Sequence, residues 1–177
     1  MAETLLRKYS VQERLNKQDL DLITILVSPD SSNGGSSASG DLLFQTAEIP
    51  NAVSVPGGTA ILESCAMIVD TNTTGNVALF IMSENISPTD GGNMATGVAL
   101  TTGDNTHGEM DAFCGICTIS GVVASGAATA IGNAANIGMV CKAAAGSKSL
   151  YVFGVQMSSA DYDDPSTMAL RFGFVKD

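Results

Sequence analysis

Four cysteines are the residues of this chain whose type and spacing first suggest chemistry. Two of them form the motif Cys114-Gly-Ile-Cys117, while Cys65 and Cys141 stand alone among apolar or small residues. A CxxC pair acts as a redox dithiol when it begins a helix, whose dipole lowers the thiol pKa, and as half of a zinc site when further ligands accompany it. This motif lies in an expected strand, where residues three apart point to opposite faces. The sequence therefore predicts four reduced, mostly buried cysteines, and neither a redox centre nor a zinc site.

The only histidine of the sequence, His107, lies in a polar loop with Asp104, Glu109 and Asp111 nearby. No serine or cysteine nucleophile motif accompanies it, so we interpret it as a solvated side chain rather than as an acid–base catalyst or a metal ligand. The acidic turn Asp161-Tyr-Asp-Asp-Pro165 lacks the spacing of an EF-hand loop and is interpreted as solvated, with weak cation binding as the alternative. We expect no catalytic residues, no cofactor and no metal site, and hence no enzyme.

Charge is low and unevenly distributed. Charged residues make up 15% of the chain, against roughly 25% in an ordinary soluble domain, and the net charge is −10. Four basic residues, Arg7, Lys8, Arg14 and Lys17, fall within the first 17 residues beside two acidic ones, so this segment carries +2 and the remainder −12. An acidic body repels nucleic acid, and the apolar runs are shorter than the ~20 residues that cross a membrane. We expect neither nucleic acid nor a membrane as a partner.

The first part of the chain differs in composition from the rest. Residues 3–18 have a helical composition, and the alternation of residues 19–27 favours a strand. Residues 29–40 are mostly Ser, Gly, Asn and Asp, which is typical of a flexible linker. We therefore expect an N-terminal arm with its linker at residues 1–39 and one β-domain at residues 40–177.

The body contains short strands separated by turn signals. The strands are expected at residues 42–48, 60–69, 76–83, 112–119, 137–142, 149–157 and 167–175. In residues 149–157 the alternation predicts one buried face and one half-covered face. Residues 120–135 are rich in Ala, Gly and Ser and are interpreted as a loop or a short helix. With almost no helical pattern, the fold class is all-β, an antiparallel sandwich or barrel, preferably jelly-roll-like.

Several stretches of the body follow one another in an order that resembles a known family. The first stretches are Gly40-Asp-Leu-Leu-Phe and Ile49-Pro-Asn-Ala-Val-Ser-Val-Pro-Gly-Gly58. They are followed by residues 60–70, by Val77-Ala-Leu-Phe-Ile-Met-Ser83 and by Phe113-Cys-Gly-Ile-Cys-Thr-Ile119. The last are Gly146-Ser-Lys-Ser-Leu-Tyr-Val-Phe and Leu170-Arg-Phe-Gly-Phe-Val-Lys-Asp177. Taken together, residues 40–177 resemble the head decoration or cement proteins of tailed bacteriophages. The long N-terminal segment and the four cysteines depart from that pattern.

This resemblance implies a non-catalytic protein that binds the outer surface of a capsid, often as a trimer, where capsid subunits meet. The implied partners are the major capsid protein and further copies of the chain, and the implied location is the capsid exterior, after assembly in the host cytoplasm. We expect residues 1–27 of the arm to carry much of the docking to the capsid or to other subunits, with the apolar stretch adding a strand to a neighbour. The residues concerned are Arg7, Lys8, Arg14, Lys17, Leu20, Leu22, Ile23, Ile25, Leu26 and Val27.

Other functions stay open at this point. A tail, fibre or receptor-binding part of a virion also fits, because β-sandwiches serve there too. A small module that binds a ligand or carbohydrate is a further alternative, although the chain has no Trp and only three Tyr to stack on a sugar. An enzyme of unfamiliar type is disfavoured by the lack of a catalytic constellation.

Overall fold

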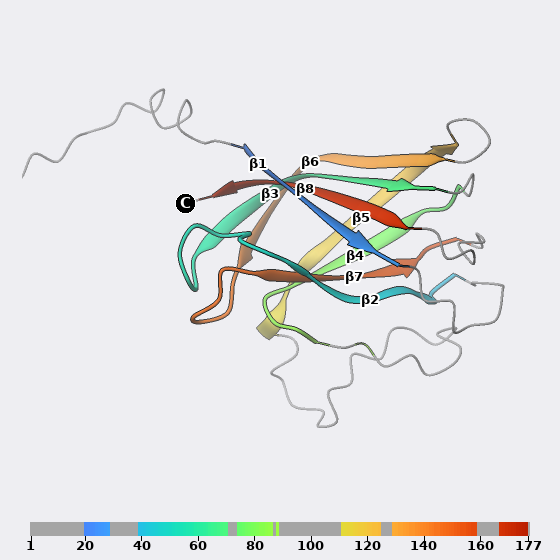
Figure 1. Ribbon diagram of the computed structural model, residues 1–177. Helices are drawn as coiled ribbons and strands as arrows, with labels where there is room; N and C mark the ends of the chain where they lie inside the picture. The colour runs from blue at the N-terminus through green and yellow to red at the C-terminus, as the bar shows by residue number, and fades with distance from the viewer. Residues whose placement is uncertain are drawn as a thin grey trace, which may run out of the picture.

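Nearly all regular structure in the part of the chain that the structure describes consists of β-strands. The computed structural model describes residues 20–28, 39–70, 74–86, 88, 111–124, 129–158 and 167–176. Within these residues the strands are β1 (Leu20–Val27), β2 (Leu42–Ile49), β3 (Thr59–Val69), β4 (Val77–Met82), β5 (Phe113–Ala124), β6 (Ala130–Lys142), β7 (Leu150–Gln156) and β8 (Met168–Lys176) (Figure 1). The expected all-β class is confirmed, and the helix predicted at residues 3–18 lies outside the described residues.

The strands follow the order β1-β8-β3-β6-β5-β4-β7-β2, and each pairs with its neighbours in antiparallel fashion. This order divides into a β1-β8-β3-β6 sheet and a β2-β7-β4-β5 sheet, and every connection except the one from β4 to β5 passes from one sheet to the other. Two four-stranded sheets connected in this way form a jelly roll, as the sequence led us to expect. The sheets join between β5 and β6, so the whole is a nearly closed barrel (Figure 1).

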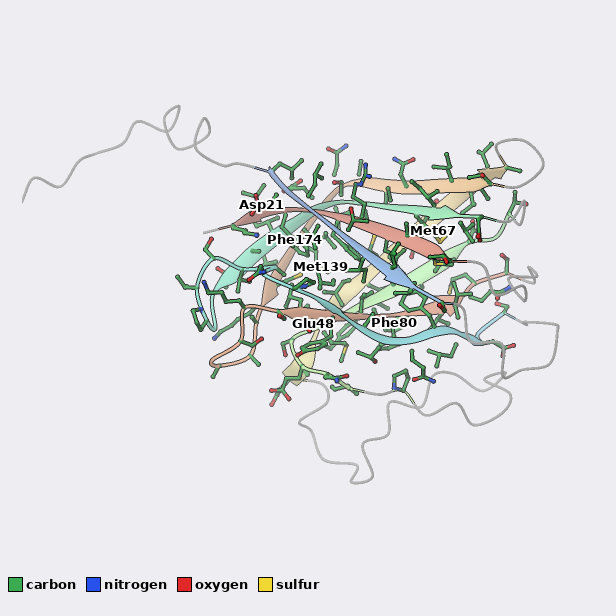
Figure 2. All side chains as sticks on the ribbon, in the orientation of Figure 1. Asp21, Glu48, Met67, Phe80, Met139 and Phe174 are labelled. Carbon is green, nitrogen blue, oxygen red and sulfur yellow. The ribbon has the colours of Figure 1, made fainter. Side chains whose placement is uncertain are left out.

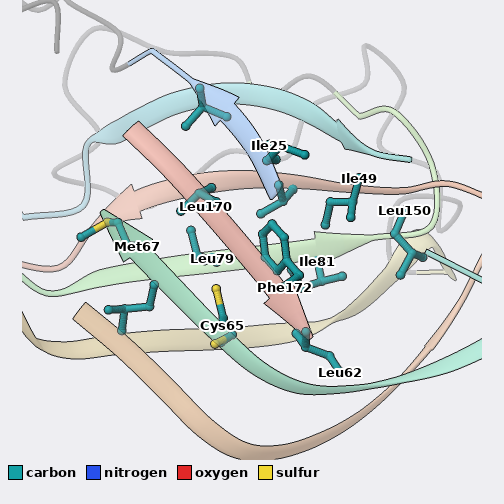
Figure 3. Packing of buried hydrophobic residues seen from close by; sticks show 14 of the residues in the cluster. Ile25, Ile49, Leu62, Cys65, Met67, Leu79, Ile81, Leu150, Leu170 and Phe172 are labelled. Atoms are coloured by element: carbon teal, nitrogen blue, oxygen red, sulfur yellow. The ribbon is translucent and has the colours of Figure 1, made fainter. Parts of the chain in front are cut away.

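The core fills the space between the two sheets. Each strand buries alternate side chains there, because successive residues of a strand point to opposite faces. Phe172 of β8, Leu79 of β4 and Met67 of β3 are fully buried (Figure 3), and Met67 is also labelled among all side chains in Figure 2. Phe44 of β2 is fully buried as well. Burying one such side chain contributes about 1.5–3 kcal/mol. Aliphatic residues and a few Phe rings therefore hold the sheets together without Trp.

The outer face of the β2-β7-β4-β5 sheet carries a second, smaller apolar cluster. Phe153 of β7 is fully buried there, and its ring stacks on that of Phe80 of β4 with the centroids 4.8 Å apart. Ile86 and Ala112, which lie at the two ends of the β4–β5 connection, pack in the same cluster. On this face Phe153 and Val155 are buried, Tyr151 is half-buried, and Met157, which follows the strand, is 50% exposed. The prediction of one buried and one half-covered face of residues 149–157 is therefore confirmed.

The segment at residues 120–135 contains strand rather than the predicted loop or short helix. β5 extends to Ala124 and β6 begins at Ala130. Small residues are needed here because the strands pack closely: a Cβ on Gly132 would lie 2.6 Å from Ile119 and 2.8 Å from Val122. Tertiary packing thus overrides the weak strand preference of Ala and Gly.

β1 forms where a strand was expected and belongs to the barrel. It pairs with β8 along its whole length, from Leu20 opposite Val175 to Val27 opposite Met168. Ile25 and Val27 are buried in the main core. The domain boundary predicted near residue 39 stays a prediction, but this strand of the predicted arm is built into the same sheet as β8 and β3.

Candidate functional site

The residues predicted for docking separate into two groups in β1. Ile23, Ile25 and Val27 point into the barrel, and Ile25 and Val27 belong to the buried core. Leu20, Leu22 and Leu26 point outward and are 50%, 60% and 70% exposed. The four predicted basic residues, Arg7, Lys8, Arg14 and Lys17, lie outside the described residues. Among the apolar residues predicted for docking, Leu20, Leu22 and Leu26 are therefore the ones exposed enough to contact a partner.

The strand registers continue these leucines into apolar rows across the neighbouring strands. One end of the sheet carries the row Leu26, Ala169, Ile68, Ile131 and Val123, in β1, β8, β3, β6 and β5. The other end carries the row Leu20, Val175, Ile61 and Val140, in β1, β8, β3 and β6. Between them lie the rows Leu22, Gly173, Ser64, Ala135 and Thr24, Arg171, Ala66, Asn133, Ser120. We call these four rows the apolar face.

Several large apolar side chains of the apolar face are exposed to solvent. Val123 is 65% exposed and Val140 is 64% exposed, although both are large β-branched residues in strands. Among the residues of the four rows, all of them described, Arg171 is the one charged side chain. It donates a hydrogen bond through Nε to Thr24 Oγ1 at 3.4 Å. Apart from Leu22, the exposed large apolar side chains of this face gather in the two end rows, with mostly small and polar residues between them, and apolar groups gathered on one face favour contact with another protein.

Sequence reasoning found the β1 part of the apolar face and missed the rest. Ile131 and Val123 fall in the segment that was interpreted as a loop or helix, so their orientation was hidden. In the structure both residues are placed by their register with Ile68, because Ile68 lies opposite Ile131 and Ile131 lies opposite Val123. A register between strands distant in sequence has no local signature.

Two thiol pairs lie where β5 passes between the sheets. Cys65 of β3 and Cys117 of β5 are buried in the main core, and their thiols hydrogen-bond to one another. This bond lowers the pKa of Cys117, and it raises the pKa of Cys65, to which burial adds. Both cysteines are reduced, as predicted.

The second pair joins Cys114 of β5 to Cys141 of β6. The hydrogen bond with the Cys141 thiol lowers the pKa of Cys114 from 9.0 to about 7, although burial acts in the opposite direction. The same contact raises the pKa of the buried Cys141 thiol. Cys114 is partly exposed, so it is the accessible member of the pair.

The prediction that Cys114 and Cys117 point to opposite faces was wrong. A register shift between Ile81 and Met82 makes Cys114 an extra residue of β5, and this bulge reverses the alternation. Both side chains pack against the main core. The two thiols nevertheless do not contact each other, because each forms a hydrogen bond with a cysteine of another strand.

No protein-family model matches this chain, and comparison with curated proteins finds no match either.

The other predicted polar sites are only partly described. His107, Asp104 and Glu109 lie outside the described residues, as does the acidic turn at residues 161–165. Asp111 is described and exposed. In the described part of the chain no three His, Cys, Asp or Glu side chains gather as metal ligands would. The described residues also include no helix of the length and apolarity needed to span a membrane.

Alkylation of the native protein tests the two thiol environments. At neutral pH we expect iodoacetamide to modify Cys114 first, because it is the accessible thiol and thiolate is the reactive form. Since the pKa of Cys114 is lowered to about 7, its rate should reach half its maximum near pH 7 instead of near pH 9. Peptide mapping after short exposure measures this, with Cys114→Ser as the control. A half-maximal rate at pH 9 would contradict the assignment.

Proposed function

We propose that this chain is a non-catalytic structural protein of a tailed-phage virion that binds the outer surface of the capsid and reinforces contacts between capsid subunits. The apolar face is the observation that carries the proposal. It covers one side of the barrel, with Leu26 and Val123 at the opposite ends of one row and Arg171 in the middle of the sheet. A monomer that stayed alone in solution would gain nothing from presenting this surface to water.

A second support is the kind of surface that the jelly roll offers. Its strands are anchored on the inside by the core, so the outward side chains are held in fixed rows, and binding to a partner orders few of them. The resemblance of residues 40–177 to the head decoration proteins of tailed phages implies a capsid as that partner. A protein present in many copies on one shell also gains avidity from contacts that are weak individually.

The copy number in purified particles tests the proposal directly. We expect mass spectrometry to find hundreds of copies per virion, in a simple ratio to the major capsid protein. A few to a few dozen copies would place the chain in the tail, a fibre or the portal vertex instead. Its absence from particles would refute a structural role in the virion and return attention to a ligand-binding module.

Charge substitution on the apolar face tests the surface itself. The double variant Leu26→Glu with Ile131→Glu should weaken binding to shells by at least about tenfold, because a central apolar contact contributes more than 1 kcal/mol. Leu26 is 70% and Ile131 44% exposed, so stability should change little. Met157→Glu, at a 50% exposed apolar residue at the end of β7, is the matched control. Equal binding by both variants would show that another surface docks.

A further inference from the structure

The two sheets of the barrel separate along much of β5 and β6. The β5–β6 pairing involves Ser120, Val123 and Ala124 of β5. Residues 113–119 of β5 pair with β4 in one sheet, whereas residues 139–142 of β6 pair with β3 in the other. Side chains therefore span the space between these two segments, which we call the β5–β6 junction.

Sulfur atoms occupy the β5–β6 junction. The Cys114 and Cys141 thiols interact with one another there. The Cys114 thiol also donates a hydrogen bond to the Lys142 carbonyl oxygen at 3.9 Å, and the Cys141 thiol donates one to the Met139 carbonyl oxygen at 3.7 Å. Beside this pair, Met139 packs directly on Gly115, where a Cβ would lie 2.8 Å from the Met139 Sδ atom. Cys114 and Cys141 are thus in contact across the junction, with Cys114 accessible from outside.

We propose that Cys114 and Cys141 form an oxidisable site that a small-molecule disulfide converts into a disulfide joining the two sheets. The inference does not depend on the proposed function, since it rests on the contact between the two thiols and on the separation of β5 from β6. Disulfides persist in oxidising surroundings outside the cytosol. The disulfide would hold the barrel closed beyond the β5–β6 pairing at Ser120, Val123 and Ala124.

The chemistry follows from the accessibility of the two thiols. The Cys114 thiolate attacks one sulfur of glutathione disulfide, forms a mixed disulfide and releases one glutathione thiolate, which takes up a proton. Cys141 then loses its proton to solvent, attacks the Cys114 sulfur and releases the second glutathione. Two protein thiols are oxidised and one glutathione disulfide is reduced to two glutathione thiols.

The other pairings are disfavoured by the same geometry. Cys117 forms a hydrogen bond with Cys65 in the main core, where both thiols are buried and inaccessible to the oxidant. A Cys114–Cys117 disulfide would require both thiols to leave their present partners. The oxidation should therefore stop at one disulfide while the fold is intact.

The full chain treated with excess glutathione disulfide under native conditions tests this. We expect free thiols to fall from four to two per chain, and non-reducing peptide mapping to find Cys114 linked to Cys141. The oxidised protein should melt roughly 5–10 °C higher than the reduced protein. Cys65→Ala is the matched control and should still form the disulfide. Cys141→Ser should stop at the glutathione adduct on Cys114.

The wild-type mapping decides the proposal even where a variant folds poorly. Retention of four free thiols, or a stable glutathione adduct on Cys114 of the wild-type chain, would overturn it. So would a Cys114–Cys117 link, or a link between two chains in place of the one within a chain.

Discussion

Replacement of Gly154 by alanine is expected to destabilise the barrel by about 3 kcal/mol or more. Gly154 of β7 lies under the ring of Phe44 of β2, and a Cβ added at this glycine would overlap the Cε1 atom of that ring. Phe44 is fully buried, so its ring can move only by displacing the side chains packed around it. Overpacking of a close-packed core costs 1–3 kcal/mol and occasionally more. Urea unfolding followed by circular dichroism measures the loss.

Two further variants separate overlap from other effects at this glycine. Phe44→Leu removes the ring, so the double variant Phe44→Leu with Gly154→Ala should cost less than the sum of the two single changes. Gly138→Ala provides a control for backbone strain, because a Cβ there meets no atom within 4 Å while φ is +64°. It should cost only about 1 kcal/mol. A similar loss for Gly138→Ala and Gly154→Ala would show that overlap with Phe44 is not the cause.

Removal of residues 1–38 is expected to cost at least about 3 kcal/mol and to promote association. The deletion takes Ile25 and Val27 out of the main core and leaves β8 without its β1 neighbour. Loss of large buried side chains costs 2–5 kcal/mol each when a cavity remains. The freed edge of β8 offers unpaired backbone groups to other chains. Thermal unfolding and sedimentation at several concentrations measure both effects.

A peptide of residues 20–28 supplied in trans is the corresponding rescue. It should restore the melting temperature and suppress association, because it can pair with β8 from Val175 to Met168 as β1 does. A truncated protein as stable as the full chain would contradict the role of β1 in the core. The result also bears on shell binding, since a truncated chain that fails to bind has lost a core strand as well as its docking residues. Substitutions on the apolar face avoid this ambiguity.

The fold was largely predictable from the sequence because most strands carry local signals. β1, β7 and β8 alternate or consist of apolar β-formers, and turn residues separate them. β6 was predicted from residue 137 only, and its first half was missed. Asn136 and Gly138 adopt φ of 56° and 64° at the irregularity within that strand. A bulge of this kind depends on the facing strand β3 and leaves little trace in the sequence.

The candidate sites were less predictable, because each depends on contacts between strands distant in sequence. The cysteines were correctly expected to be reduced and mostly buried, yet their partners were not foreseen. Cys114 meets Cys141 only because the bulge near Met82 turns it inward. The apolar face likewise combines β1 with β6, which are far apart along the chain and are brought together by β8 and β3.

The place of β8 in the sheet governs when the protein can fold during synthesis. β8 lies between β1 and β3, so the first strand of the sheet has no partner until residues 168–176 have left the ribosome. Until then β1 and β3 both present open backbone edges and uncovered apolar side chains. Pairing over such long sequence separations is slow. The nascent chain therefore passes through a stage, lasting until β8 has left the ribosome, in which it depends on dilution or chaperones to avoid aggregation.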